Sequence, residues 1–272
     1  MTISNRDQLI DALANNSTAL VINKASIATQ IAGGFSSLWR ATGVPGQGAI
    51  PGAAAVCTKA LTGAFTFTNP TAPVKTYLTR LFLVSGNTAT NVQIHDRLSH
   101  MGGLSGTVIT AQTVNVDVDV ATSNMILRRG DANFSDVQWW LEWYTATGST
   151  GVNATCAVTY DDASTGNVVV AIPASTGASR MLMIPPAVAG RFIKSIQSVT
   201  LSATTGTAGS FGITATRNLG GLDLGLANAG TVGDWSYLGI PRVHDDACLA
   251  MVMLVSTTST GALYGSGKLS QG

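Results

Sequence analysis

The chain has 272 residues, of which 45% are hydrophobic and only 11% are charged, and its formal net charge is +1. This length allows one large or two modest domains with a real core, and a net charge near zero provides no long-range field to attract nucleic acid or an anionic membrane. The charged fraction is far below the roughly 25% of an average soluble domain, and sparsely charged surfaces are typical of packed assemblies, where a buried charge would have to lose its water.

The start of the chain predicts neither export nor membrane insertion. Residues 1–7 lack a basic segment followed by an apolar one, and no run in the chain reaches the roughly 18 apolar residues of a membrane span. We therefore expect synthesis in a cytoplasm. The cysteines are odd in number and widely spaced, which predicts small buried hydrophobic residues rather than a disulfide framework or a zinc site: Cys57, Cys156 and Cys248.

Residues 1–60 are predicted to form an N-terminal arm. Residues 6–13 carry apolar side chains at helical spacing and predict a short helix, with Ser4 or Asn5 as its N-cap. Residues 31–63 are rich in Gly, Ala, Ser and Pro and predict loop or extended chain, which is unusual over such a length inside a compact domain. The arm is expected to become ordered only against a partner or the rest of its own protomer, through three apolar anchors: Phe35, Leu38 and Trp39.

From about residue 62 the pattern changes to short β-strands. Short runs of strand-forming residues, such as 65–68, 81–84, 114–120 and 168–172, are separated by clusters of Gly, Ser, Thr and Asn. Many short strands at close spacing predict an all-β sandwich or barrel rather than alternating strands and helices.

An internal repeat organises this β region. Residues 79–98 and 197–219 both read as strand, turn rich in Thr, Gly and Ala, strand, and then Arg and Leu. A segment starting with proline precedes each block, and the matching segments 140–151 and 251–261 follow them. The repeat predicts two tandem, related, jelly-roll-like sandwiches behind the arm. The predicted limits are 1–60 for the arm, 61–162 for the first sandwich and 163–272 for the second.

Candidate metal-binding and catalytic residues are few. The histidines match no metal-ligand spacing, so no metal site is predicted, and polar turn residues are the better interpretation: His95, His100 and His244. Motifs for a nucleophile elbow, a phosphate-binding loop or a dinucleotide site are absent from the sequence. We therefore expect no catalytic residue, no cofactor and no enzymatic activity.

An acidic strand face is predicted to lie at an interface. Asp117 and Asp119 stand roughly 6.5–7 Å apart on one face of a strand, a spacing that inverting glycosidases use but that any D-x-D strand also has. Pairing with Arg128 and Arg129 of a neighbouring subunit is the preferred interpretation.

Residues 139–144, with the sequence WWLEWY, form an aromatic cluster. Alternation along a strand directs Trp139 and Trp143 to one face and Trp140 and Tyr144 to the other. One face is expected in the core, with Trp140 and Tyr144 at an interface, and stacking on carbohydrate is the alternative.

Several segments resemble virion proteins of tailed phages. They are the opening residues 4–13 (SNRDQLIDAL), residues 35–39 (FSSLW) with the Gly/Pro/Ala tract, residues 96–106 (DRLSHMGGLSG) and residues 201–209 (LSATTGTAG). The chain is similar to structural proteins that decorate or cement the head. The resemblance implies trimers with jelly-roll domains, and an N-terminal arm that reaches neighbouring subunits.

We therefore expect a virion protein that stabilises a phage head through contacts with its own copies, as a homotrimer, and with the major capsid protein. It is expected to bind neither nucleic acid nor membrane, and to be made in the cytoplasm of the bacterial host. A capsid shell, collar, tail or fibre component is the alternative within the virion. A carbohydrate-binding or adhesion module is the alternative from another class.

Overall fold

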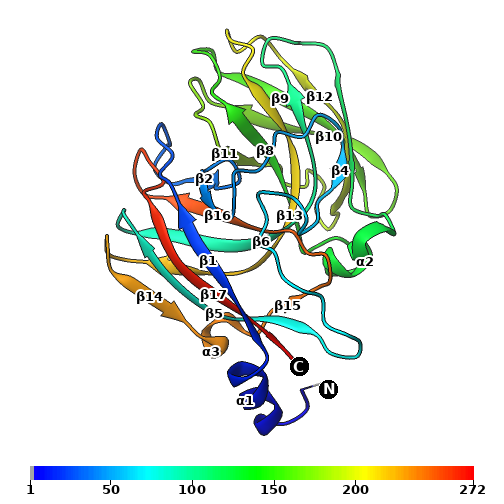
Figure 1. Cartoon of the computed structure of the whole chain (residues 1–272). Helices are drawn as coiled ribbons and strands as arrows, with labels where there is room; N and C mark the ends of the chain where they lie inside the picture. The colour runs from blue at the N-terminus through cyan, green and yellow to red at the C-terminus, as the bar shows by residue number, and fades with distance from the viewer. Residues whose placement is uncertain (1–2) are drawn as a thin grey trace.

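The computed structural model describes residues 3–272, and most of it consists of antiparallel β-strands (Figure 1). The helical elements are α1 (Arg6–Ala14), the 3-10 turn η1 (Thr122–Asn124), α2 (Met125–Arg128) and α3 (Trp235–Leu238). The strands are β1 (Ser17–Lys24), β2 (Gly34–Ser37), β3 (Gly43–Val44), β4 (Ala55–Val56), β5 (Thr76–Ser85), β6 (Thr90–Leu104), β7 (Gln112–Asp117), β8 (Val137–Thr145), β9 (Val152–Tyr160), β10 (Thr165–Ile172), β11 (Arg180–Met183), β12 (Ile193–Leu201), β13 (Ser210–Leu224), β14 (Gly230–Gly233), β15 (Arg242–Val243), β16 (Leu249–Val255) and β17 (Leu263–Gln271). The prediction of an all-β fold with a short N-terminal helix is confirmed.

The strands form two outer sheets and one central sheet. Outer sheet A has the order β14-β5-β17-β1-β3, with β15 also paired to β5. Outer sheet D has the order β10-β9-β12-β7, and the central sheet has the order β13-β8-β11-β2-β16-β6-β4. Because β13 also pairs with β6, six strands of the central sheet close into a ring.

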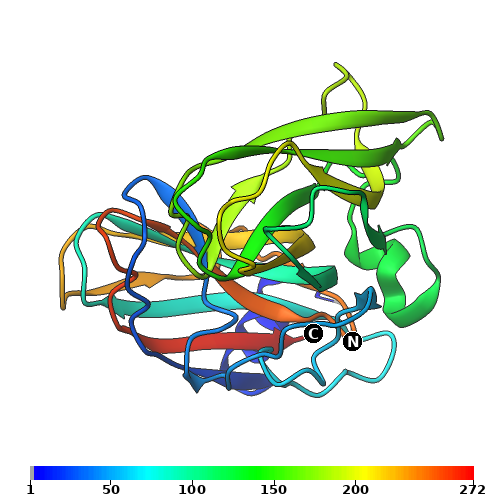
Figure 2. The same ribbon diagram turned by 90° about the horizontal axis from the view of Figure 1, so that it is seen from above.

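Two hydrophobic cores divide the molecule into two sandwiches. In sandwich I, sheet A packs on β16 and on one half each of β6 and β13, with buried apolar residues from positions 20–94 and 219–269. In sandwich II, sheet D packs on β8 and on the other halves of β6 and β13, with buried apolar residues from positions 98–215. Figure 2 shows the green and yellow strands of sandwich II above the blue, cyan and red strands of sandwich I.

Sandwich II is therefore inserted into sandwich I and does not follow it along the chain. The predicted limit at 162/163 falls in the turn of the β9–β10 hairpin, whose two strands pair within sheet D. The predicted limits do not separate the two cores, because β6 and β13 each continue from one core into the other.

The predicted arm lies within the sheets of its own protomer. Strand β1 is inserted between β17 and β3 in sheet A, and β2 lies between β11 and β16 in the central sheet. The α1 helix begins after Asn5, whose side-chain oxygen accepts a hydrogen bond from the Gln8 N–H at 2.9 Å, an N-cap that satisfies an otherwise unpaired donor. At the end of this helix, Lys268 Nζ donates to the carbonyl of Leu13 at 2.5 Å.

The internal repeat has a counterpart in the strand pairings. Exchanging β5 with β12, β6 with β13, β8 with β16, β9 with β17, β10 with β1 and β11 with β2 converts the pairings of one sandwich into those of the other. At the centre, Asp96 of β6 lies opposite Arg217 of β13. Arg97 of β6 likewise lies opposite Thr216 of β13. The two halves are thus related by a pseudo-two-fold axis that passes between β6 and β13.

One glycine on β13 allows the two long strands to approach closely. A β-carbon placed on Gly212 would lie 1.8 Å from the carbonyl oxygen of Met101 on β6. We expect Gly212→Ala to lower the free energy of unfolding by roughly 1–3 kcal/mol, because the backbone must shift to make room. Gly225→Ala is the matched control, since its β-carbon meets nothing within 4 Å. Equal urea midpoints for the two variants would contradict this account.

Candidate functional site

Most of the predicted interface residues lie inside their own protomer. Phe35 is half-buried and contacts Trp140 edge-on, with 5.2 Å between the ring centroids. The other members of this group are at most 7% exposed: Leu38, Trp39, Arg128, Arg129, Trp140 and Tyr144. A side chain packed within its own fold is not free to contact a neighbour, so these residues are corrected to internal positions. The anchors of the arm hold it to its own chain.

A buried ion pair lies within the ring of the central sheet. Arg97 Nη2 is 2.6 Å from Glu142 Oε2, and the two side chains are 2% and 0% exposed. Arg97 also donates to His100 Nδ1 and Thr214 Oγ1, each at 3.0 Å. The guanidinium lies over the ring of Trp39, with 4.6 Å to the ring centroid. No substrate can reach this pair, so its contribution is structural.

Electrostatics keep this pair charged. Burial alone would raise the pKa of the Glu142 carboxyl, but attraction to Arg97 and hydrogen bonds from Arg97 and Thr214 outweigh it and lower that pKa. Burial alone would lower the pKa of Arg97, and the charge of Glu142 raises it instead. A low-dielectric interior strengthens the attraction that maintains both charges.

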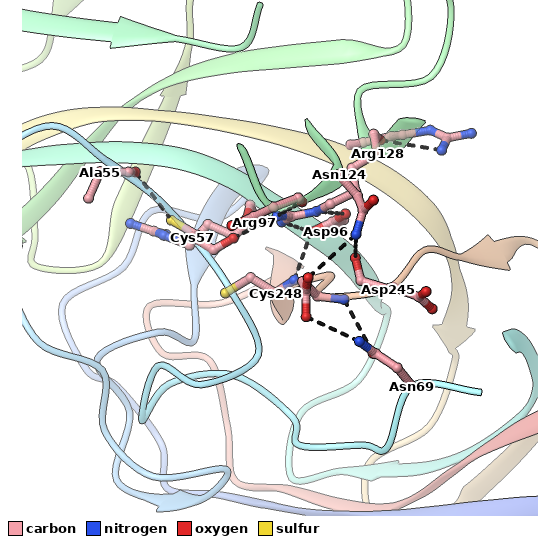
Figure 3. Close-up of polar contacts among 12 residues, drawn as sticks. Ala55, Cys57, Asn69, Asp96, Arg97, Asn124, Arg128, Asp245 and Cys248 are labelled. Carbon is pink, nitrogen blue, oxygen red and sulfur yellow. Dashed lines mark hydrogen bonds and ion pairs between the residues drawn. The ribbon is translucent and has the colours of Figure 1, made fainter. Parts of the chain in front are cut away.

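A second buried pair lies beside the first. Arg128, from α2, contacts Asp96 of β6 through Nη2 to Oδ1 at 2.6 Å and Nε to Oδ2 at 2.9 Å (Figure 3). The same guanidinium donates to the carbonyls of Cys57 and Arg97, at 2.8 and 3.0 Å. Asp96 Oδ1 also accepts the N–H of Cys248 at 2.9 Å. One ion pair therefore ties α2, β6 and the residues before β16 together.

The predicted pairing of acidic and basic residues between subunits occurs within one chain. Arg129 Nη1 forms an ion pair with Asp119, and Lys194 Nζ lies 3.5 Å from the same carboxylate. Asp117 accepts the N–H of Asp119 at 2.7 Å, which makes it a turn residue at the end of β7. These contacts close the β7–β8 connection. Arg129 and Lys194 both have an acidic partner within their own chain.

The aromatic cluster is buried on both faces of β8. Trp139 and Trp143 belong to the core of sandwich II, as alternation predicts. Trp140 and Tyr144 point into the ring instead of to an outer surface, where Tyr144 Oη accepts from Arg97 at 3.1 Å. The carbohydrate alternative required an exposed aromatic surface, and these residues do not provide one.

The histidines occupy separate positions. Nδ1 of His95 is 3.0 Å from Thr216 Oγ1, and burial lowers the pKa of His95 to about 3, so it is neutral. Burial also lowers the pKa of His244, to about 4. Across residues 3–272 no group of three or more His, Cys, Asp and Glu side chains is arranged to hold a metal ion. In the same part of the chain, no helix has both the length and the apolarity needed to cross a membrane.

The outer face of sheet A carries several exposed apolar side chains. Side chains that point away from the core form adjoining rows across its strands, with Asn23 and Ser266 between the apolar ones. The large apolar side chains of this face are Val21, Val44, Phe82, Val84, Val232 and Tyr264. Val21, Val44, Val232 and Tyr264 are 60%, 46%, 52% and 49% exposed. Arg80 and Lys268, opposite one another on β5 and β17, place two cations at one end of this face.

Sheet D provides an internal comparison for this surface. The repeat aligns Leu81 with Val199; Leu81 pairs with Gly267, and Val199 pairs with Cys156, which makes Gly267 and Cys156 counterparts. By the same registers, Val21 corresponds to Val169, and both are 60% exposed.

Three further positions on the outer faces of sheets A and D differ in polarity. Phe82, Val84 and Tyr264 of sheet A correspond to Thr200, Ser202 and Asn153 of sheet D. The core-facing positions of both sheets are mostly apolar, so the difference in polarity lies mainly on the outside. A polar outer face is compatible with water, whereas the apolar face of sheet A loses free energy when it stays exposed.

One feature of the sequence, an uninterrupted apolar run, indicates this apolar outer face. Residues 81–84 read Leu-Phe-Leu-Val, apolar at every position, whereas a strand with one wet face alternates. Such a run predicts a strand covered on both faces, and only one covering layer is present in the protomer.

Comparisons with known proteins give no assignment. No protein-family profile matches the chain, and no curated protein matches it. Among solved structures, the VP2 subviral particle of infectious bursal disease virus matches at 13% identity, covering 96% of this chain and 81% of that one, with a TM-score of 0.23. The infectious bursal disease virus Gt strain matches at 11% identity, covering 94% and 82%, with a TM-score of 0.18. TM-scores of this size do not establish a common fold.

Proposed function

We propose that this chain is a non-enzymatic structural protein of a virion, and specifically a decoration or cement protein of a phage head. The observation that carries the proposal is the apolar outer face of sheet A, at positions where the related sheet D is polar. A face of this kind is stabilised by a partner that removes it from water, and each fully buried Val or Phe side chain contributes roughly 1.5–3 kcal/mol.

The expected partners are further copies of the chain, as a homotrimer, and the major capsid protein. The low charge of the chain favours this, because few charges need to be desolvated on contact. Weak contacts of one copy add up when many copies bind to one particle. A capsid shell, collar, tail or fibre position uses the same surface, and the number of copies per particle distinguishes these roles.

Replacing Val21 by threonine should weaken assembly, whereas replacing Val169 should not. Both valines are 60% exposed and occupy equivalent strands, so Val21→Thr and Val169→Thr are matched in chemistry and exposure. The triple variant Phe82→Thr, Val84→Ser, Tyr264→Asn gives sheet A the residues of sheet D and should weaken assembly at least about tenfold, or about 1.4 kcal/mol. Analytical ultracentrifugation measures self-association, and co-sedimentation with purified particles measures attachment.

Two results would reject the proposal. The first is equal association of the triple variant and the wild type when circular dichroism shows both to be folded. The second is absence of the chain from purified virions by quantitative mass spectrometry. Hundreds of copies per particle would favour the decoration or shell role, and a dozen or fewer would favour the tail or collar.

A further inference from the structure

Two cysteines far apart in sequence lie next to each other on one edge of β6. The N–H of Cys57 donates to the carbonyl of Leu98 at 2.9 Å, and the carbonyl of Cys248 accepts the N–H of Arg97 at 2.8 Å. Since β13 occupies the other edge of β6, both cysteines lie along the same edge, one residue step apart. One step along a strand is roughly 3.3 Å, and the Cys57 and Cys248 side chains are close enough to share a hydrogen bond. A disulfide requires such neighbours, with α-carbons roughly 4.4–6.8 Å apart.

The two thiols also share one apolar environment. Cys57 and Cys248 are both free and belong to the same small cluster, packed with Trp39 and Tyr144. Figure 3 shows both cysteines near Asp96 and Arg97. The third cysteine, Cys156, lies in the core of sandwich II and provides a comparison within the same molecule.

The surroundings shift the pKa values of the two thiols in opposite directions. Burial alone would raise the pKa of Cys57, but hydrogen bonds with Cys248 and His100 and the charge of Arg97 place it well below its ordinary value. Burial and the neighbouring Cys57 raise the pKa of Cys248. Burial raises the pKa of Cys156 to about 12, which leaves that thiol unreactive.

We propose that Cys57 and Cys248 form a redox site that closes to an intramolecular disulfide when a peroxide oxidises the folded protein. The Cys57 thiolate attacks one oxygen of hydrogen peroxide, the O–O bond breaks and hydroxide leaves, giving a sulfenic acid. The Cys248 sulfur then attacks the Cys57 sulfur and breaks the S–O bond. The hydroxide released in each step takes up one thiol proton, that of Cys57 in the first step and that of Cys248 in the second, so two thiols and one peroxide give one disulfide and two waters.

Such a bond would attach the irregular segment around β4 to the residues that lead into β16. Among residues 45–73, β4 is the sole strand and has two residues, so this segment has few ladder hydrogen bonds and opens more readily than the sandwiches. Local opening admits an oxidant as small as peroxide. Because the bond closes a loop of most of the chain, its effect on the unfolded state is large.

The test is peptide mapping of the folded wild-type chain after treatment with hydrogen peroxide. Remaining thiols are alkylated in denaturant before trypsin digestion. We expect a linked pair of peptides, residues 41–59 with residues 243–268, one alkylatable thiol instead of three, and a rise in Tm of roughly 5 °C or more. Cys57 and Cys248 should lose their thiols at least about tenfold faster than Cys156.

The variants and a denatured control complete the experiment. Cys156→Ser should form the same link with no thiol remaining, and Cys248→Ser should form none. Peroxide treatment in guanidinium should abolish the preference for this pair, because the fold no longer holds the sulfurs together. A folded protein in which Cys57 and Cys248 stay alkylatable, or are linked to Cys156 or to another chain, would overturn the proposal.

Discussion

Replacing Glu142 by glutamine should lower the free energy of unfolding by about 3–5 kcal/mol, because it leaves the Arg97 guanidinium buried without a counter-charge. The substitution is nearly isosteric, and the glutamine oxygen still accepts from Thr214 Oγ1, which donates to Glu142 at 2.6 Å. The loss therefore reports the charge and not the packing. Urea unfolding followed by circular dichroism at neutral pH measures it.

Asp136→Asn is the control for this prediction. Asp136 pairs with Arg217 at 3.5 Å with 41% and 24% of the side chains exposed, and an exposed pair of this kind contributes about 0–1 kcal/mol. If Glu142→Gln lowers the free energy of unfolding no more than Asp136→Asn does, the buried Arg97–Glu142 pair does not stabilise the ring as its geometry indicates.

The same pair has a consequence for acid stability. Since the folded-state pKa of Glu142 lies below its unfolded value of about 4.3, its contribution is complete above that pH and is lost as the pH falls through the folded pKa. When the pH is lowered below about 4.5, the free energy of unfolding of Glu142→Gln should therefore fall less than that of the wild type. His95 adds a separate loss in both proteins, because the unfolded state takes up a proton near pH 6.5 and the folded state only near 3.

Replacing Asp96 by asparagine should also cost about 3–5 kcal/mol, for the same physical reason at a different place. Arg128 is fully buried and would keep its charge without the carboxylate that accepts from Nη2 and Nε. The effect should be greatest in α2 and in the residues before β16, because Asp96 links both to β6. Hydrogen exchange read by mass spectrometry should show faster exchange in residues 122–130 and 245–250.

Asp223→Asn separates this effect from the loss of any carboxylate on the long strands. Asp223 lies on β13, is exposed and accepts from Asn91 at 2.8 Å. Its replacement should leave exchange in α2 unchanged. Faster exchange in α2 for Asp223→Asn, or none for Asp96→Asn, would show that Arg128 is not held by Asp96.

The sequence predicted the class of fold and several local structures. The helix of residues 6–14 with Asn5 as its cap and the alternating strands follow from short-range physics, since caps and periodicity depend on neighbouring residues. The alternation of β8 correctly separated Trp139 and Trp143 from Trp140 and Tyr144. The internal repeat correctly identified β5, β6 and β8 as the counterparts of β12, β13 and β16.

The insertion of one sandwich into the other was beyond these signals. Periodicity shows which face of a strand is buried, but not which sheet covers it, and β6 changes its covering sheet between Ile94 and Leu98. Asp96 and Arg97 lie at that place. Their partners, Arg128 and Glu142, follow 32 and 45 residues later in the sequence. A charged dipeptide inside a strand was the available signal, but the neighbouring His95 was interpreted as a polar turn residue. Acidic and basic residues elsewhere were assigned to subunit contacts because no intramolecular partner is visible in a linear pattern.

The shared strands determine how the molecule responds to force. Both connections between the sandwiches, β6 and β13, run side by side and hydrogen-bond to each other along the junction. A load that pulls sandwich II from sandwich I is carried by these two continuous backbones in parallel. The sandwiches can part only if half of a strand slides out of its own sandwich, which shears its ladder with β16 or β8. Shear loads many hydrogen bonds together, whereas peeling loads them in sequence. The junction between the two cores is thus built to resist a load that would separate them.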